Sequence, residues 1–304
     1  MSANRADVVI IGGGPAGLEA ALVLGRAGKR TMVFDDPAAP RNAASHGIHN
    51  FIGAEGVHPD ALRERVRAEI AQHSNVTFHH QAVVDILPAP RDEDAYVVVG
   101  GEGFEATARK VILAFGYRDR FPALEGFDAC WGLTVIPCPF CDGYENQGRV
   151  WGVVPRTPDE LAVQPRLVLH WTKTVLLFLS PDLSIENDYR VDLLREGIAI
   201  HSGRITRIDQ HHGRIEAVTL DSGARHEVGT LLWVPEPEPT PLSQRLQHNL
   251  GLRCDTDGFI HTNESFATNL RNVWAIGDVK GWTGALSAAA AGYSAAVALL
   301  KSPR

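Results

Sequence analysis

Residues 7–35 read DVVIIGGGPAGLEAALVLGRAGKRTMVFD, and this stretch decides the fold. A short apolar run, 7–11, is followed by a glycine-rich turn over 12–17, an Ala- and Leu-rich segment, and a second apolar run over 31–34 that leads into Asp35. This order predicts a strand, a turn, a helix and a strand. The acidic residue, 18 positions after the last glycine, completes the pattern of a dinucleotide-binding turn.

Each glycine of this turn has a physical task. Gly12 permits the tight turn, Gly14 lets a pyrophosphate approach the backbone, and Gly17 allows the helix to pack closely on the strand. The N–H groups at the start of the helix then face the phosphate charge, and Asp35 accepts hydrogen bonds from ribose hydroxyls. The joint occurrence of strand, spacing and acid disfavours the alternative, a glycine-rich turn that binds nothing.

The length, composition and net charge of the chain limit the class of protein. The 304 residues predict two domains or one large one, and 44% hydrophobic with 21% charged residues exclude a disordered chain, a collagen-like repeat and a long coiled coil. The net charge of −7 gives no support to a nucleic-acid groove. Four cysteines, no signal-peptide pattern, and an Ala-rich segment at 285–300 too short to cross a bilayer predict a cytoplasmic protein without a membrane partner.

The rest of the chain repeats the α/β pattern. Residues 149–234 begin again with an apolar run, and the proline-rich string over 235–241 is typical of a linker or a crossing segment. We expect helices over 59–73 and 284–300, and strands over 76–86, 96–99, 110–114, 175–179 and 273–277.

The motif Cys138-Pro139-Phe140-Cys141 has three interpretations: a redox pair, half of a zinc site, or two unrelated buried thiols. A structural zinc site needs four ligands, and Cys130 and Cys254 lack the paired spacing that would complete one. A zinc site is therefore disfavoured and we expect no metal, while a redox pair and two buried thiols both stay open on this evidence alone. Cys130 and Cys254 are interpreted as small buried hydrophobic residues.

Four motifs occur in an informative order: residues 12–17, residues 41–53, residues 138–144 (CPFCDGY) and residues 275–279 (AIGDV). Together they resemble the low-molecular-weight thioredoxin reductase family, and the motifs are most similar to a branch that includes dithiol oxidases of natural-product pathways. The resemblance implies two Rossmann-like, three-layer α/β domains. An FAD domain made from 1–117 and 242–304 would surround an inserted domain, 118–241, and the protein would be a homodimer.

The resemblance also implies site residues. Cys138 would exchange with substrate, Cys141 would lie against the flavin, and Asp142 would act as acid and base, although Asp before Gly is also a common turn residue. His46 and His49 lie near the expected flavin loop, where a surface or packing role is favoured over a substrate contact. The implied FAD contacts are Gly12, Gly14, Pro15, Ala16, Gly17, Asp35, Arg41, Asn42, Asn50, Val83, Ala114, Gly116, Asp278, Ala285 and Leu286.

Several places depart from the family pattern. Phe115 replaces a threonine, and Ala285-Leu286 replaces a polar pair. More importantly, the second glycine-rich turn, which would hold NADPH near 154–159, is missing. No glycine occurs from 153 through 196, 44 residues in which the average frequency would place about four. Pro155 and Pro158 also lack N–H donors there.

After the strand expected over 175–179, Asp182 stands where the family usually has a basic cluster for the NADPH 2′-phosphate. The sequence therefore predicts an FAD-dependent dithiol/disulfide oxidoreductase that does not use NADPH. Its electron partner would be molecular oxygen or a ferredoxin-type donor, and its substrate a small dithiol or disulfide or a thioredoxin-like protein. The alternatives are an NADPH-thioredoxin reductase with a diverged pocket and a flavin-bound redox sensor.

Overall fold

The structure is a computed structural model, and it describes residues 4–38 and 40–302. The chain divides into two compact units. Unit 1 contains residues 1–43, 57–119 and 237–304, and unit 2 contains residues 44–56 and 120–236. Within the described ranges, no helix is both long enough and apolar enough to cross a membrane.

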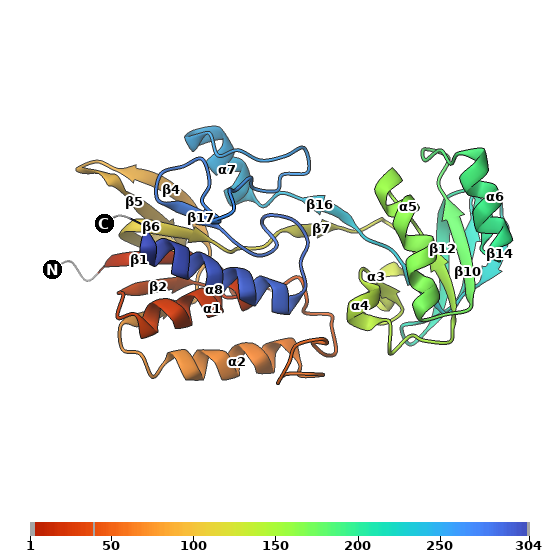
Figure 1. Ribbon diagram of the computed structural model, residues 1–304, viewed down its shortest axis with the longest axis horizontal. Helices are drawn as coiled ribbons and strands as arrows, with labels where there is room; N and C mark the ends of the chain where they lie inside the picture. The colour runs from red at the N-terminus through yellow and green to blue at the C-terminus, as the bar shows by residue number, and fades with distance from the viewer. Residues whose placement is uncertain (1–3, 39, 303–304) are drawn as a thin grey trace. The chain divides into compact units, whose positions relative to one another are not determined.

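Unit 1 is built on a seven-stranded sheet of order β3-β2-β1-β6-β5-β4, with β17 also paired to β6 (Figure 1). Strands β1, β2, β3, β6 and β17 are parallel, whereas β4, β5 and β6 form an antiparallel meander. The elements of unit 1 are β1 (Arg5–Ile11), α1 (Pro15–Arg26), β2 (Thr31–Phe34), α2 (Pro59–Ile70), β3 (Val76–His79), β4 (Val83–Ala89), β5 (Asp92–Gly100), η1 (Gly101–Gly103), β6 (Glu105–Leu113), α7 (Pro241–Leu250), β17 (Val273–Ala275) and α8 (Ala285–Lys301).

Strand β6 pairs with two different strands along one of its edges. Its first half, residues 105–108, pairs with β5, and its last residues, 111–113, pair with β17 from the far end of the chain. Both chain ends are therefore required to complete the sheet.

The alternation of β1 places apolar side chains on both faces of this sheet. Val8 and Ile10 pack with α1, α2 and α8, whereas Val9 and Ile11 pack with the meander and α7. Helices α1 and α8 approach so closely that a Cβ at Gly292 would lie 2.2 Å from the backbone oxygen of Ala16. Only glycine fits at this crossing.

Unit 2 is a three-layer α/β unit. Its parallel sheet has the order β11-β10-β9-β15-β8; α5 and α6 pack on one face, and the antiparallel sheet β12-β13-β14 packs on the other (Figure 1). The elements are α3 (Phe127–Cys130), β8 (Val135–Ile136), α4 (Pro139–Asp142), β9 (Val150–Val153), α5 (Pro158–Leu167), η2 (Val168–His170), β10 (Thr174–Leu179), α6 (Asn187–Arg195), β11 (Ala199–Ser202), β12 (Ile205–His211), β13 (Arg214–Leu220), β14 (Arg225–Glu227) and β15 (Thr230–Leu232).

The α/β fold class expected from the sequence is confirmed, and most elements lie within a few residues of their expected ranges. One expectation is wrong in detail. The run over 76–86 is not one strand, because the parallel β3 ends at His79 and the antiparallel β4 begins at Val83. The proline-rich string is a crossing segment, as expected: it carries the chain from unit 2 to unit 1, and its residues Glu236–Glu238 form β16, which pairs with β7 (Arg118–Arg120).

Candidate functional site

The two cysteines of the motif lie at the first turn of α4 in unit 2. Cys138 is the N-cap residue, and its Sγ accepts a hydrogen bond from the Cys141 N–H at 3.2 Å. Pro139 occupies the first helical position, where its missing N–H has no consequence. Gly143 follows because a Cβ there would lie 2.2 Å from the Pro139 carbonyl oxygen. Both cysteines are thiols in the structure.

The surroundings favour a thiolate at Cys138. A hydrogen bond from the Cys141 side chain lowers the pKa of the Cys138 thiol, and burial opposes this without cancelling it. The N–H groups of Cys141 and Phe140 add to the lowering, whereas the charge of Asp142 counteracts it. Cys138 is 4% exposed and Cys141 is half-buried. The division of roles between the two sulfurs stays a prediction.

Asp142 ends α4 and is 6% exposed. Burial is the main influence and raises the pKa of Asp142 to about 6. The rings of His46 and His49 act in the opposite direction, and the carboxylate of Glu145 reinforces the increase. A carboxyl that titrates near neutral pH beside a dithiol can exchange protons with thiols.

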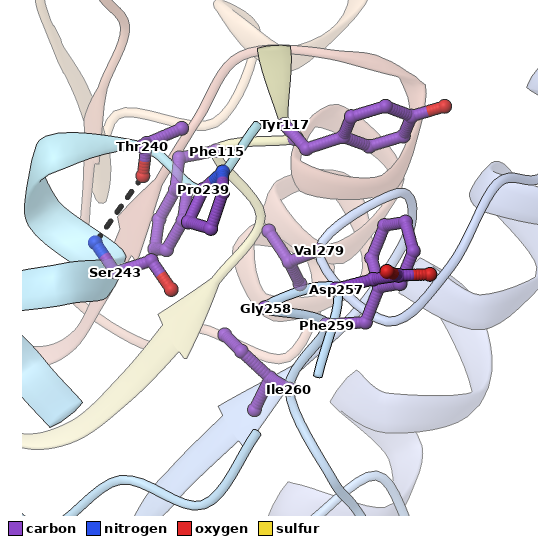
Figure 2. A pocket seen from close by; sticks show the side chains of 11 residues that line it. Phe115, Tyr117, Pro239, Thr240, Ser243, Asp257, Gly258, Phe259, Ile260 and Val279 are labelled. Atoms are coloured by element: carbon purple, nitrogen blue, oxygen red, sulfur yellow. Dashed lines mark hydrogen bonds between the residues drawn. The ribbon is translucent and has the colours of Figure 1, made fainter. Parts of the chain in front are cut away.

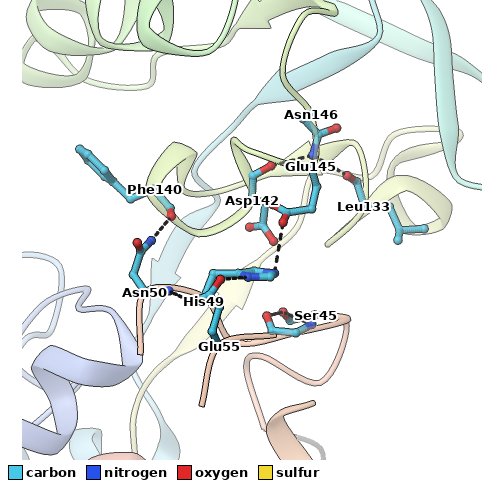
Figure 3. A network of polar contacts seen from close by, with 10 residues as sticks. Ser45, His49, Asn50, Glu55, Leu133, Phe140, Asp142, Glu145 and Asn146 are labelled. Atoms are coloured by element: carbon cyan, nitrogen blue, oxygen red, sulfur yellow. Dashed lines mark hydrogen bonds and ion pairs between the residues drawn. The ribbon is translucent and has the colours of Figure 1, made fainter. Parts of the chain in front are cut away.

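Residues 44–56 form a loop that lies against α4 within unit 2 (Figure 3). The Asn50 side-chain amide donates to the Phe140 carbonyl oxygen at 2.5 Å. His49 Nδ1 lies 2.8 Å from Glu55 Oε1, and its Nε2 lies 3.5 Å from Glu145 Oε1. A surface or packing role was expected for His46 and His49. In the structure both rings also interact electrostatically with Asp142. Asn50, expected to bind cofactor, here contacts the dithiol helix.

Asn146 is a structural residue that sequence reasoning missed. It is buried, and its side-chain amide nitrogen donates to the carbonyl oxygens of Leu133 at 3.1 Å and Asp142 at 2.9 Å. Its side-chain oxygen accepts from the Thr230 hydroxyl at 3.0 Å. These bonds fix the end of α4 to the central sheet. No local sequence signal marks this asparagine.

In unit 1 the glycine-rich turn has the geometry expected of it. Gly12 has φ +116°, and a Cβ there would lie 2.2 Å from the Ala114 carbonyl oxygen. A Cβ at Gly17 would lie 1.9 Å from the Gly12 oxygen, whereas Gly14 faces open space. Helix α1 begins at Pro15 and has no side-chain cap among the described residues, and its first turn contains no acid. Its free N–H groups suit a phosphate.

Asp35 follows β2 and faces this turn. Its Oδ1 accepts from the Gly13 N–H at 2.9 Å, and its Oδ2 forms an ion pair with Arg67 of α2. The carboxylate is therefore held at the end of β2, where the resemblance places a ribose. Arg67 was not expected from the sequence.

A second charged group in unit 1 surrounds Arg41. Its Nε lies 2.8 Å from Asp119 Oδ2, its Nη1 lies 3.9 Å from Asp278 Oδ2, and its guanidinium stacks over Tyr117 and Trp282. Within residues 4–38 and 40–302, Arg41 Nη2 is buried and has no hydrogen-bond partner. Burial raises the pKa of Asp278, whose Oδ1 accepts from the Thr283 N–H and hydroxyl.

The other residues expected to contact FAD lie in the core of unit 1, at the start of α8 or beside a small pocket. Val83 is buried in the unit 1 core, and Leu286 is 43% exposed just after the start of α8. Ala16 packs against Gly277, and Ala285 begins α8 after Gly284. Gly116 has φ +67° and lines a small pocket with Phe115, Tyr117 and Phe259 (Figure 2). Asn42 lies in the turn over residues 41–44.

These groups fit FAD. Both α1 and α8 begin after a glycine with no side-chain cap from the described part of the chain and no acid in the first turn. Neither Gly14 nor Gly284 has another atom within 4 Å of an added Cβ, and the unpaired Arg41 nitrogen adds a donor. Two open helix N-termini match the negative charge of a pyrophosphate, and the half-buried Arg41, although paired with Asp119, can still donate from Nη2. The described residues include no cluster of three or more His, Cys, Asp or Glu suited to a metal.

The chain is similar to known proteins over most of its length. Residues 6–148 and 168–296 match the model of the family described as pyridine nucleotide-disulphide oxidoreductase. The thioredoxin reductase sirT of Leptosphaeria maculans is 31% identical over 90% of this chain and 86% of its own length. The thioredoxin reductase aclD of Aspergillus oryzae is 28% identical over 91% of this chain and 90% of its own length.

Solved structures agree. The crystal structure of HlmI superposes with a TM-score of 0.88 at 32% identity and covers 99% of this chain and 93% of its own. The putative thioredoxin reductase TrxB of Bacillus anthracis gives a TM-score of 0.87 at 25% identity and covers 97% of both chains. The protein therefore belongs to the pyridine nucleotide-disulphide oxidoreductase family and is a thioredoxin reductase-like, FAD-dependent thiol–disulfide oxidoreductase.

Proposed function

We propose that this oxidoreductase exchanges electrons between dithiol or disulfide substrates and FAD through Cys138 and Cys141, without NADPH. The observation that carries the proposal is the start of α5. In a nucleotide-binding α/β unit, the N-terminus of this helix receives the pyrophosphate. Here the side chain of Thr157 caps the helix, and the carboxylate of Glu160 lies in its first turn.

Two side chains bind backbone N–H groups at this end of α5. The hydroxyl of Thr157, the N-cap residue, accepts from the Glu160 N–H at 3.2 Å. Glu160 Oε2 accepts from the N–H of Arg156, the residue before the cap, at 2.7 Å, and the Arg156 guanidinium lies 3.3 Å from the other Glu160 oxygen. One N–H group that a phosphate would use is therefore already bound by Thr157, and a carboxylate lies beside it.

The charges oppose NADPH as well. Asp159 and Glu160 both lie in the first turn of α5, whereas α1 in unit 1 has no acid there. A pyrophosphate would have to displace Glu160 and lie beside its negative charge. After β10, Asp182 pairs with Arg204, so the nearby cation is already neutralised. Together these contacts support the proposal that the inserted unit no longer receives a dinucleotide.

The dithiol chemistry follows from the residues of α4. In the oxidising direction, a substrate thiolate attacks Cys138 Sγ in the disulfide form, the Cys138–Cys141 bond breaks, and Cys141 leaves as a thiolate. The second substrate thiol then gives its proton to Asp142 while its sulfur attacks the mixed disulfide. Cys138 leaves as a thiolate, and the substrate departs as a disulfide. FAD, when bound, accepts the electron pair of the dithiol.

An anaerobic reduction experiment tests the proposal. We expect dithiothreitol to bleach the flavin absorbance of the purified holoprotein, and NADPH to leave it unchanged over the same time. Dithionite serves as the control that the flavin can be reduced. Rapid bleaching by NADPH would refute NADPH independence and favour the diverged-pocket alternative.

Two further measurements identify the electron partner. Oxygen uptake driven by a dithiol indicates an oxidase, whereas bleaching by reduced ferredoxin followed by disulfide reduction indicates the reverse direction. If no dithiol and no electron donor changes the flavin absorbance, the result would favour the alternative of a flavin-bound redox sensor.

Variants of the two cysteines test their roles. We expect Cys138→Ser to abolish bleaching by dithiothreitol while FAD stays bound. Cys141→Ser, when supplied with a linear disulfide, should instead attack it through the Cys138 thiolate, keep one half as a mixed disulfide on Cys138 and release the other half as a thiol. Trapping only in Cys138→Ser would reverse the assignment.

A further inference from the structure

We propose that His49 is a positioning residue for the thiol–disulfide reaction: its imidazolium, held by Glu55 and Glu145, keeps Asp142 in the ionised form that takes a proton from a substrate thiol. The inference rests on the acid–base role proposed above for Asp142. It adds His49, which lies 93 residues before Asp142 in the chain and for which the sequence favoured only a surface or packing role.

The ring is held from two sides (Figure 3). His49 Nδ1 lies 2.8 Å from Glu55 Oε1, and the other Glu55 oxygen accepts from the Asn50 N–H at 2.8 Å. Glu55 is thus fixed at both oxygens while it binds the ring. The Asn50 side chain in turn bonds the Phe140 carbonyl oxygen, so the loop and the dithiol helix are joined directly beside the histidine.

The opposite side of the ring faces α4. His49 Nε2 is buried and forms no hydrogen bond within the described part of the chain, and Glu145 Oε1 is 3.5 Å away. Figure 3 shows the carboxyl groups of Asp142 and Glu145 both directed toward this ring. A ring bound by a carboxylate at Nδ1 and facing carboxyl groups at Nε2 is best accommodated as the cation.

Among the described residues, the charged groups that act on this cluster come from the loop and from the segment that carries the dithiol. From the loop come His46, His49 and Glu55; from α4 and the turn after it come Asp142 and Glu145; and the Cys138 sulfur feels the charge of Asp142. Burial works against a proton on His49, but the hydrogen bond to Glu55 and the charges of Glu145 and Asp142 together raise the pKa of His49.

The positive charge of His49 matters because Asp142 is almost completely buried. A carboxylate removed from water ionises only where a positive charge compensates for the lost solvation. Taking the cation away should raise the pKa of Asp142 by roughly one unit from its value of about 6. The ionised fraction at pH 6.5 would then fall about threefold, while at pH 8.5 it would hardly change.

A titration of the carboxyl group tests this directly in the holoprotein. Aspartate labelled with carbon-13 at its carboxyl carbon gives a resonance for Asp142, which is assigned by its loss in Asp142→Asn. We expect this resonance to titrate roughly one pH unit higher in His49→Gln than in the native protein. Titration within about 0.3 unit of the native value would overturn the proposal.

Two further variants keep the test decisive. Glu55→Gln removes the carboxylate that binds the ring and should shift the titration in the same direction by a smaller amount, and it should add nothing when His49→Gln is already present. If His49→Gln does not fold, an unshifted Glu55→Gln protein overturns the proposal. His261→Gln, the same change at an exposed histidine of unit 1, should leave the titration unchanged.

The rate of flavin bleaching by dithiothreitol gives the second readout. In His49→Gln we expect about a threefold slower rate at pH 6.5 and a native rate at pH 8.5. An equal loss at both pH values would indicate a structural role and contradict the proposal. If dithiothreitol bleaches no form of the protein but the titration shifts as expected, the proposed function fails and the electrostatic role of His49 stands.

Discussion

Replacement of Asp142 by asparagine should stabilise the protein in neutral solution and not in acid. Asp142 has a pKa of about 6 in the folded chain, against 3.8 for the ordinary side chain. The folded state therefore holds the proton more tightly than the unfolded state. As the pH rises from about 3.8 through about 6, the native protein loses stability at this residue.

The magnitude follows from the difference between the two pKa values. About 2.2 units at 1.36 kcal/mol each give a penalty of about 3 kcal/mol above pH 7, which falls to below 1 kcal/mol at pH 4. The side chain is 6% exposed, so solvent does not screen this term. Asparagine carries no charge and avoids the penalty. Any effect of the changed shape is the same at both pH values and cancels from the comparison.

Urea unfolding followed by tryptophan fluorescence measures the effect. Four of the six tryptophans, at positions 131, 151, 171 and 233, belong to unit 2, so the signal mainly reports the unit that contains Asp142. We expect Asp142→Asn to gain about 2 kcal/mol relative to the native protein when the buffer changes from pH 4 to pH 8. A difference in unfolding free energy between variant and native protein that is the same at both pH values, or less favourable to the variant at pH 8 than at pH 4, would refute the reasoning.

Two further substitutions test the framework around the sites. Asn146→Ala removes three hydrogen bonds, two of them buried, and should cost about 3 kcal/mol of unfolding free energy in the same urea assay, and a loss below about 1 kcal/mol would contradict the anchoring role. Gly292→Ala places a Cβ 2.2 Å from the Ala16 oxygen and should cost about 1–3 kcal/mol and lower FAD occupancy, because it displaces the first turn of α1. Ser294→Ala, on an exposed face of the same helix, is its control, and equal losses in the two variants would argue against the steric explanation.

The parts of the molecule that could be predicted from the sequence are those determined by neighbouring residues. The glycine turn at 12–17, the helix after it and the strand before Asp35 follow from spacing alone, and the turn has the close approaches that exclude side chains at Gly12 and Gly17. The interpretation of Cys130 as a buried hydrophobic residue is confirmed, and Cys254 is only partly buried.

The position of the loop 44–56 could not be predicted. The bond between Asn50 and Phe140 joins residues 90 positions apart, and the His49 and Glu145 side chains are even farther apart in sequence. Neither residue type is unusual for a loop, so the sequence suggested a surface or packing histidine. The titration of Asp142 depends on this tertiary contact and on burial, which no local pattern encodes.

The shared edge of β6 has a consequence for synthesis on the ribosome. Its partner β17 begins at residue 273, and α8, which packs on α1, follows still later. The N-terminal βαβ segment therefore leaves the ribosome long before its sheet and helix layer can close. Residues 120–236 contain all the secondary structure of unit 2 and are complete much earlier. Residues 120–236 can thus reach their native structure first, whereas the N-terminal segment completes its sheet only after the last residues have been synthesised.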